Sequence, residues 1–196
     1  MEKVEDAMDN MVKKEQYETE RLCIRHFDSV DADSCYMGWG QNEQLGKFIF
    51  GYPMTKEKMK SFVVTMEKNE NAWVIVERKS GQCIGYITVD IPYLQLAIGE
   101  IGYVIGGNFQ RKGYAYEAVS KLLHIYFEEK SLYMMEAKYN IYNVSSEKLL
   151  KKLGFVTDGI LRNRRINLQT EQRCDLVVCS LCRDDCLPDK NRKYTK

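Results

Sequence analysis

The sequence lacks any long uninterrupted run of apolar residues. No stretch approaches the roughly 20 residues that a membrane-spanning helix needs. The N-terminal stretch, MEKVEDAMDNMVKKE, is too acidic and too often interrupted by charge for a secretory signal. We therefore expect a cytoplasmic protein with no membrane partner.

An excess of charge of either sign is also missing. Lys and Arg number 29 and Asp and Glu number 28, which gives a net charge of +1. Proteins that bind nucleic acid usually carry a basic surface that pairs with phosphates. The composition therefore gives no reason to expect a nucleic-acid partner.

Residues of metal sites and of common catalytic motifs are scarce. Cys179-Ser-Leu-Cys182 is followed by Cys186, but no second C-x-x-C and no nearby histidine pair completes four zinc ligands. The seven cysteines are an odd, scattered set, which suits reduced thiols better than a disulfide framework. The sequence also contains no Ser/His/Asp order, P-loop lysine motif or G-x-G-x-x-G. We expect no metal.

The apolar residues that are present follow strand spacing in some segments and helix spacing in others. With 196 residues, 44% of them hydrophobic, and no repeat or linker, the chain fits one α/β domain with a sheet flanked by helices. We place this domain at residues 19–186, after an N-terminal extension (1–18) that is either a short helix or a frayed terminus, and before a polar tail (187–196). About seven strands are expected, at residues 21–27, 72–77, 83–90, 98–105, 132–139, 155–167 and 174–183, with Pro92 ending the third. Helices are expected at 28–37, at 55–69, after Gly113 and at 144–153.

One strand–loop–helix junction combines a glycine-bearing loop with a strongly amphipathic helix. The loop is Gln110-Arg-Lys-Gly113-Tyr-Ala115, and the apolar residues after it fall on one helical face. A helix that starts at small residues presents free backbone N–H groups and the positive end of its dipole. The junction therefore predicts a phosphate-binding site.

The loop Gln110-x-x-Gly113-x-Ala115 resembles the acetyl-CoA signature of the GNAT N-acetyltransferase superfamily. Further stretches in the same order resemble that family, in particular its ribosomal-protein alanine and serine acetyltransferases: Thr19 to Arg25, Glu100 to Gly106, Asn143-x-x-Ser146 and Leu153-Gly154-Phe155. The resemblance implies a mixed, twisted sheet that parts between the strand ending at Ile105 and the strand starting at Leu132. Acetyl-CoA is then expected in this opening.

The resemblance also implies which residues contact the cofactor. Its pantetheine arm would lie like an added strand against the backbone of Val104 and Ile105. Its pyrophosphate would meet the backbone amides of Gln110, Arg111, Lys112, Gly113, Tyr114 and Ala115. The side chains of Arg111 and Lys112 either add phosphate contacts or are solvated loop cations. Asn143 is expected both to cap a helix and to contact pantetheine.

The resemblance assigns chemistry to Glu100 and Ser146. An attacking amine must be neutral, so a base is useful, and Glu100 occupies a matching strand position. The alternative for Glu100 is a solvent-facing charge or a partner for a basic side chain. Many GNAT enzymes protonate the departing thiolate from a tyrosine three residues before Leu-Gly-Phe, but Leu150 stands there. Ser146 is our substitute, and its alternative role is to bond the first turn of its own helix.

The acceptor is expected to meet two less regular segments. One is the glycine-rich stretch 38–53 with Trp39, and the other is the last hairpin with Arg162, Arg164 and Arg165, which either attracts an acidic acceptor or is simply solvated.

The predicted function is transfer of acetyl from acetyl-CoA to a primary amine, of a protein N-terminus or a small molecule, by direct attack in a ternary complex. The protein would be a monomer or homodimer. The alternatives are a non-catalytic acyl-CoA-binding or interaction module, and an antibiotic or small-amine acetyltransferase.

Overall fold

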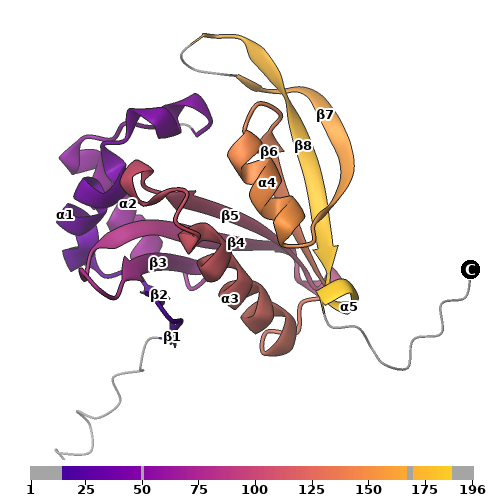
Figure 1. The fold of residues 1–196 in the computed structure, drawn as a ribbon, viewed down its shortest axis with the longest axis horizontal. Coiled ribbons are helices and arrows are strands. Elements are labelled where there is room, and N and C mark those ends of the chain that lie inside the picture. The colour runs from indigo at the N-terminus through magenta and orange to yellow at the C-terminus, as the bar shows by residue number, and fades with distance from the viewer. Residues whose placement is uncertain (1–14, 50, 167–169, 187–196) are drawn as a thin grey trace, which may run out of the picture.

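The computed structural model describes residues 15–49, 51–166 and 170–186, and Figure 1 shows their arrangement. The strands are β1 (Gln16–Glu18), β2 (Leu22–His26), β3 (Ala72–Glu77), β4 (Cys83–Tyr93), β5 (Ile98–Ile105), β6 (Met134–Asn140), β7 (Val156–Ile166) and β8 (Arg173–Cys182). The α-helices are α1 (Ala32–Cys35), α2 (Lys56–Glu67), α3 (Tyr114–Glu128), α4 (Val144–Lys152) and α5 (Arg183–Cys186). Short 3-10 helices are η1 (Ser29–Asp31), η3 (Glu43–Lys47), η4 (Leu94–Leu96) and η5 (Gly107–Phe109), and η2 (Tyr36–Gly40) is a π-helix.

The strands form one sheet in the order β1-β2-β3-β4-β5-β6-β8-β7. Every neighbouring pair is antiparallel except β5 and β6, which are parallel and connected through α3. The predicted mixed sheet flanked by helices is therefore confirmed. The described residues contain eight strands rather than about seven, because Gln16–Glu18, inside the expected extension, pairs with β2. Residues 1–14 of that extension and the polar tail lie outside the described residues.

The predicted separation of two central strands is confirmed. Strand β5 pairs with β6 only over Ile98–Glu100, opposite Met134–Glu136. Beyond that point β5 continues along β4 as far as Ile105, whereas β6 continues along β8 as far as Asn140. Figure 1 shows β6, β7 and β8 diverging from β4 and β5. The separation leaves the second half of β5 without a strand neighbour on the β6 side.

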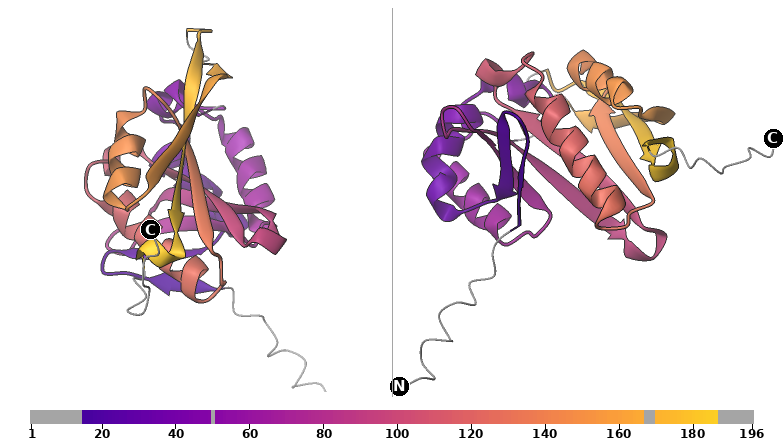
Figure 2. Two further views of the ribbon diagram at one scale, coloured as in Figure 1. Left: turned by 90° about the vertical axis from the view of Figure 1, so that its right-hand side faces the viewer. Right: turned by 60° about the horizontal axis from the view of Figure 1, so that its bottom comes forward.

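Helices cover both faces of the sheet, and each face has its own core. Buried residues of α3, among them Ala118, Leu122 and Tyr126, pack in one cluster with strand residues such as Ile101. Figure 2 shows α3 lying across this face. Buried residues of α1, η2 and α2 form the second cluster with other strand residues, including Val104. Alternate residues of β5 therefore contribute to opposite cores.

The expected helix at 28–37 is instead three short helical pieces. Asp28 caps the first, η1, by accepting from the Val30 N–H at 3.1 Å. After α1 the helix changes to the wider π-helical turn of η2. There, a Cβ on Gly38 would lie 1.9 Å from the Cys83 carbonyl oxygen of β4. The close approach of η2 to the sheet is thus possible only at glycine, and a regular α-helix does not continue through it.

Pro92 does not end its strand, so that expectation is wrong. Strand β4 runs to Tyr93, and the pairing of β4 with β5 is irregular between Asp90 and Tyr93. An irregularity in the ladder is a place where the missing N–H of proline costs no hydrogen bond. The strand therefore continues through the proline.

A buried ion pair fixes β2 against the start of η1. Arg25 donates from Nη1 and Nη2 to the two carboxylate oxygens of Asp31, at 2.8 and 2.7 Å, and the Asp28 N–H also donates to Asp31 at 2.9 Å. Burial raises the pKa of Asp31, but the hydrogen bonds from Arg25 and Asp28 outweigh it and hold this pKa below its usual value. The carboxylate is therefore ionised in the folded protein at neutral pH.

We expect Asp31→Asn to lower the free energy of unfolding by up to about 3 kcal/mol at neutral pH, since it leaves a mostly buried Arg25 without its charge partner. The pKa of Asp31 in the folded protein lies below its unfolded value of about 3.9. The stability that Asp31 contributes is therefore fully present above about pH 3.9 and is lost as the pH falls through the folded-state pKa. Urea unfolding over a pH series measures both effects. Lys130→Gln, which breaks the exposed Lys130–Glu15 pair, is the control and should cost less than about 1 kcal/mol. An equal loss in both variants would contradict the assignment.

Candidate active site

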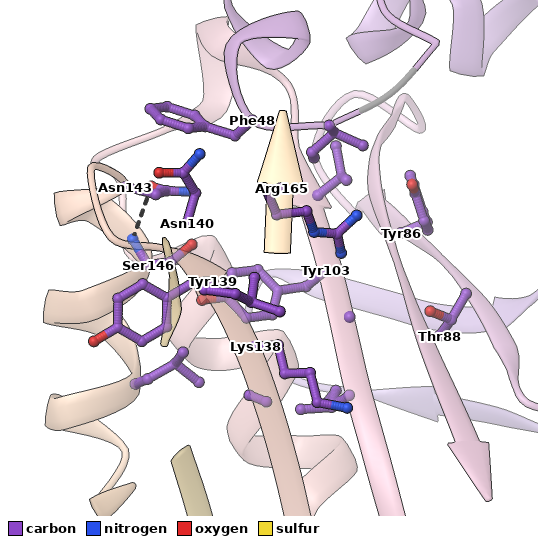
Figure 3. Close-up of a pocket in the computed structure, with 17 residues that line it drawn as sticks. Phe48, Tyr86, Thr88, Tyr103, Lys138, Tyr139, Asn140, Asn143, Ser146 and Arg165 are labelled. Carbon is purple, nitrogen blue, oxygen red and sulfur yellow. Dashed lines mark hydrogen bonds between the residues drawn. The ribbon is translucent and has the colours of Figure 1, made fainter. Parts of the chain in front are cut away.

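A cavity of about 320 Å³ lies where β5 and β6 separate. Its lining comes from β4, β5, β6, α4, β7 and β8, together with Phe48, Ile49 and Asn143 (Figure 3). The polar side chains include Thr88 of β4, Lys138 of β6, Ser146 of α4 and Arg165 of β7. The sheet therefore opens onto a polar-lined space that strands from both halves reach.

Strand β5 presents different residues to the two sides of this opening. Glu100, Gly102 and Val104 point to the face covered by α1 and α2, and Tyr103 and Ile105 point to the face of α3. Beyond Glu100 the edge of β5 has no strand partner within the described ranges. The open edge can therefore receive an extended ligand near the two residues predicted for this contact, although the Val104 carbonyl oxygen lies against Gly85 of β4 and the Ile105 carbonyl accepts from Gln110 Nε2.

The predicted phosphate loop has the backbone geometry that anion binding requires. Arg111 and Gly113 both adopt positive φ, 60° and 84°, and Gly113 precedes α3 without a capping side chain. The Glu117 N–H makes the first hydrogen bond of the helix, to the Gly113 carbonyl at 3.0 Å. The N–H groups of Tyr114 and Ala115 consequently have no partner within the helix. These residues fit a pyrophosphate group.

The loop is closed by one of its own side chains. Gln110 donates from Nε2 to the Ile105 carbonyl at 2.9 Å, which connects the end of β5 to the loop. Arg111 and Lys112 are exposed, so both alternatives for their side chains stay open.

The first turn of α3 is anchored to the turn between β1 and β2. The Glu117 carboxylate accepts from Thr19 Oγ1 at 2.6 Å, from the Arg21 N–H at 2.9 Å and from Arg21 Nε at 2.7 Å, while Arg21 Nη1 donates to the Lys112 carbonyl at 2.8 Å. Burial raises the pKa of Glu117, but its hydrogen bonds with Thr19 and Arg21 outweigh burial and lower it. Since Arg21 balances this carboxylate, Glu117 does not leave a net negative charge beside the loop.

Glu100 is ion-paired rather than isolated. Its Oε2 lies 2.5 Å from Lys138 Nζ, and the side chains of Glu100 and Lys138 are 35% and 27% exposed. Glu136 lies directly opposite Glu100 in the β5–β6 register, but it is 3.9 Å from the same ammonium. The predicted alternative of a partner for a basic side chain is therefore what Glu100 forms here, at the last paired position before β5 and β6 separate and outside the cavity lining.

The start of α4 brings Asn143 and Ser146 to the cavity. Asn143 caps the helix as predicted, with Oδ1 accepting from the Ser146 N–H at 3.2 Å, and its Nδ2 is left for another acceptor. Leu150, one turn further on, is 2% exposed and belongs to the α3-side core. Ser146 therefore supplies a hydroxyl where Leu150 has none.

The two residues predicted to contact the acceptor lie outside the cavity lining. Trp39 is 1% exposed and packs against Tyr52, Phe62 and Tyr86 in the second core. Arg162 is exposed on β7, whereas Arg165 of the same strand lines the cavity. Arg165 rather than Arg162 therefore lines the cavity, and Trp39 is a core residue that packs against Tyr86.

Sequence reasoning missed Lys138 and Tyr103. Lys138 meets Glu100 only because the parallel register sets Glu100 opposite Glu136, and no local pattern encodes that register. Tyr103 alternates with Glu100, Gly102 and Val104 along β5, and this spacing alone could have assigned it to the α3 face.

Two further properties concern the described residues only. They contain no group of three or more His, Cys, Asp or Glu residues arranged to hold a metal ion. Among the helices of the same residues, none is both long and apolar enough to cross a membrane.

The family of the chain follows from comparison with known proteins. The model of the acetyltransferase (GNAT) domain matches residues 21–156, so the chain belongs to the GNAT family and is an acetyl-CoA-dependent acetyltransferase. A curated relative, the uncharacterized N-acetyltransferase p20 of Bacillus licheniformis, is 32% identical over 151 residues, which cover 74% of this chain and 84% of that protein.

Solved structures share the fold. The ribosomal-protein-S5-alanine acetyltransferase of Vibrio fischeri superposes with a TM-score of 0.75 at 22% identity, covering 87% of this chain and 98% of that one. The microcin C7 self-immunity acetyltransferase MccE, solved with acetyl-CoA and AMP, gives a TM-score of 0.75 at 21% identity over 84% of this chain and 93% of that one. At these identities the likeness shows the fold, and the resemblance inferred from the sequence motifs is confirmed at that level.

We expect Gly113→Ala to weaken acetyl-CoA binding about tenfold. A side chain at positive φ costs about 1–2 kcal/mol, and relief of that strain would turn the loop amides away from the ligand. Isothermal titration calorimetry measures the affinity. Gly154→Ala is the matched control, since Gly154 has φ 96° at the end of α4. It should cost similar stability and leave the affinity unchanged, and equal weakening in both variants would contradict a loop-specific role.

Proposed function

We propose that the protein transfers the acetyl group of acetyl-CoA to a primary amine by direct attack in a ternary complex. The observation that carries the proposal is the free edge of β5 beside the amide-bearing start of α3. When bound, acetyl-CoA supplies an acetyl thioester that an amine can attack. The chain's own residues then have three tasks: to hold the cofactor, to orient the amine and to remove its proton.

Cofactor binding is divided between the loop and the strand. A helix terminus contributes about 0.3–1 kcal/mol per exposed charge, whereas micromolar affinity needs about 8 kcal/mol. The amides of residues 110–115 therefore cannot supply the affinity alone. The edge of β5 that is unpaired beyond Glu100 and ends near Val104 and Ile105, with Asn143 Nδ2 across the opening, offers hydrogen-bonding positions for an extended pantetheine arm.

Glu100 is the proposed base for the amine. A lysine-like amine has a pKa of about 10.4 and an α-amine about 8, so either is mostly protonated at neutral pH. Glu100 accepts the proton on a carboxylate oxygen, directly or through water. Lys138 Nζ lies 2.5 Å from this carboxylate and fixes its direction before the amine arrives.

We expect Glu100→Gln to reduce acceptor-dependent release of CoA thiol by about 10²–10⁴-fold, the usual contribution of a general base. Glu136→Gln is the matched control because Glu136 is the opposite carboxylate in the register but is 3.9 Å from Lys138. Intact turnover in Glu100→Gln would remove Glu100 from the mechanism.

The acceptor screen should include small amines and peptides with N-terminal alanine or serine. Thermal stabilisation by acetyl-CoA without turnover on any of them would favour the alternative, a non-catalytic acyl-CoA-binding module.

The acceptor side of the cavity favours an acceptor with an anionic group. Arg165 lines the cavity and has no ion-pair partner in the described part of the chain, whereas the charge of Lys138 is balanced by Glu100. Figure 3 shows Arg165 and Lys138 on the side of the cavity that Thr88 and Tyr86 also reach. A carboxylate close to the acceptor amine would pair with Arg165 at the mouth.

We expect the wild type to prefer peptides with Asp or Glu at the second position over matched peptides with Lys, and Arg165→Gln to reduce this preference about fivefold, as loss of one partly exposed ion pair of about 1 kcal/mol predicts. Values of kcat/KM for the paired peptides measure it. Lys68→Gln, an exposed charge at the end of α2, is the control. An unchanged preference in Arg165→Gln would refute the acceptor class.

A further inference from the structure

One buried polar group at the β5–β6 separation has no partner. The hydroxyl oxygen of Tyr103 is inaccessible to solvent and makes no hydrogen bond with any residue that the structure describes, although the tyrosine lines the cavity. A buried hydroxyl without a partner is costly, and native structures contain few of them. Such a group points to an interaction that the free protein does not complete.

Ser146, which lines the same cavity, is a polar group that can complete it. Burial raises the pKa of Tyr103 to about 12, and the Ser146 hydroxyl partly opposes this rise, although the two hydroxyls form no hydrogen bond in the free protein. In Figure 3 Tyr103 extends from β5 toward Ser146. Rotation about one side-chain bond of Ser146 changes the direction of its hydroxyl without moving the backbone.

We infer that Tyr103 is a positioning residue for acetyl transfer: its hydroxyl donates to Ser146 Oγ and thereby directs the Ser146 proton toward the sulfur of the cofactor. This inference rests on the proposed function. Tyr103 of β5 and Ser146 of α4 would together replace the tyrosine hydroxyl that many GNAT enzymes have at the position of Leu150. The two residues thus span the opening that the cofactor is proposed to enter.

The pair stabilises the leaving sulfur without giving up a proton. In the transfer, the C–N bond forms, the C–S bond breaks, and the electron pair of the latter stays on sulfur, while Glu100 accepts the proton of the amine. A tyrosine whose pKa is about 12 stays protonated at working pH, far above the roughly 8.5 of an ordinary thiol. Tyr103 and Ser146 therefore act as hydrogen-bond donors, and the thiolate takes its proton later from solvent.

The other titratable groups near Tyr103 do not provide this donor. Cys179 is buried, its hydrogen bond goes to the Ala137 carbonyl, and burial raises its pKa to about 11. Burial also raises the pKa of Tyr139, so it stays neutral. The Lys138 ammonium is engaged by Glu100. Ser146 is consequently the group through which Tyr103 can act on a ligand.

The test measures the thiol of bound CoA and needs no acceptor. The ultraviolet absorbance of the thiolate is titrated with CoA bound to the wild type, Tyr103→Phe, Ser146→Ala and the double variant. In the wild type we expect the thiol pKa to lie below the roughly 8.5 of a free thiol. Both single variants should raise it by at least about half a unit, a threefold change in ionisation. The double variant should add little to either, since the two hydroxyls act in series.

Tyr126→Phe is the matched control. Tyr126 is also buried, but its hydroxyl accepts from Trp73 Nε1 at 3.1 Å and donates to Asn71 at 2.9 Å, away from the cavity. Tyr126→Phe should lower the melting temperature and leave the thiol pKa of bound CoA unchanged. Tyr103→Phe should raise the thiol pKa of bound CoA without lowering the melting temperature, because it removes a hydroxyl that has no hydrogen-bond partner in the free protein.

The outcomes separate the two proposals. If CoA binds and Tyr103→Phe leaves its thiol pKa at the wild-type value, the role of Tyr103 is refuted while the proposed function stands. If the wild type binds neither CoA nor acetyl-CoA, both proposals are overturned.

Discussion

The structure depends on the backbone edge of β5 that lacks a strand partner. An open edge inside a sheet is unfavourable, because its N–H and C=O groups have no protein acceptor or donor. Here it persists because β4 holds β5 on one side and β8 holds β6 on the other, so neither strand can turn to close the opening. The site is therefore produced by the sheet topology, and the side chains around it only select what enters.

Hydrogen bonds from the β1–β2 turn and from β2 hold the helices on both sides of that opening. Thr19 and Arg21 hold Glu117, which orients the first turn of α3 and the Lys112 carbonyl of the phosphate loop. Arg25 holds Asp31 on the other face of the sheet. The stretch from Thr19 to Arg25, which resembles a family motif, thus has a physical role. Its polar residues hold α3 on one face of the sheet and η1 on the other, so that the loop amides are oriented before a ligand binds.

Local patterns predicted what is encoded locally. Helical spacing located α3, and the amide side chain at Asn143 predicted the cap of α4. The separation of β5 from β6 came from the family resemblance, since no periodicity encodes which strands pair. Long-range contacts were not predictable: the burial of Trp39 depends on a close glycine contact with β4, and the Glu100–Lys138 pair depends on a parallel register. A proline in an irregular ladder was read as a strand end because its neighbours were unknown.

The alternation of β5 separates the two halves of the proposed reaction. Glu100 pairs with Lys138, which lines the cavity together with Gly102 and Arg165, so the proposed base is connected to the cavity through Lys138. Tyr103 faces α3 and reaches toward Ser146, on the side assigned to the cofactor. Because successive side chains of a strand point to opposite faces, a shift of one residue in register would exchange the two sets. The close packing of Gly85, whose added Cβ would lie 2.1 Å from the Val104 carbonyl oxygen, opposes such a shift. The arrangement of base and donor on opposite faces is therefore fixed by the β4–β5 pairing rather than by the site residues themselves.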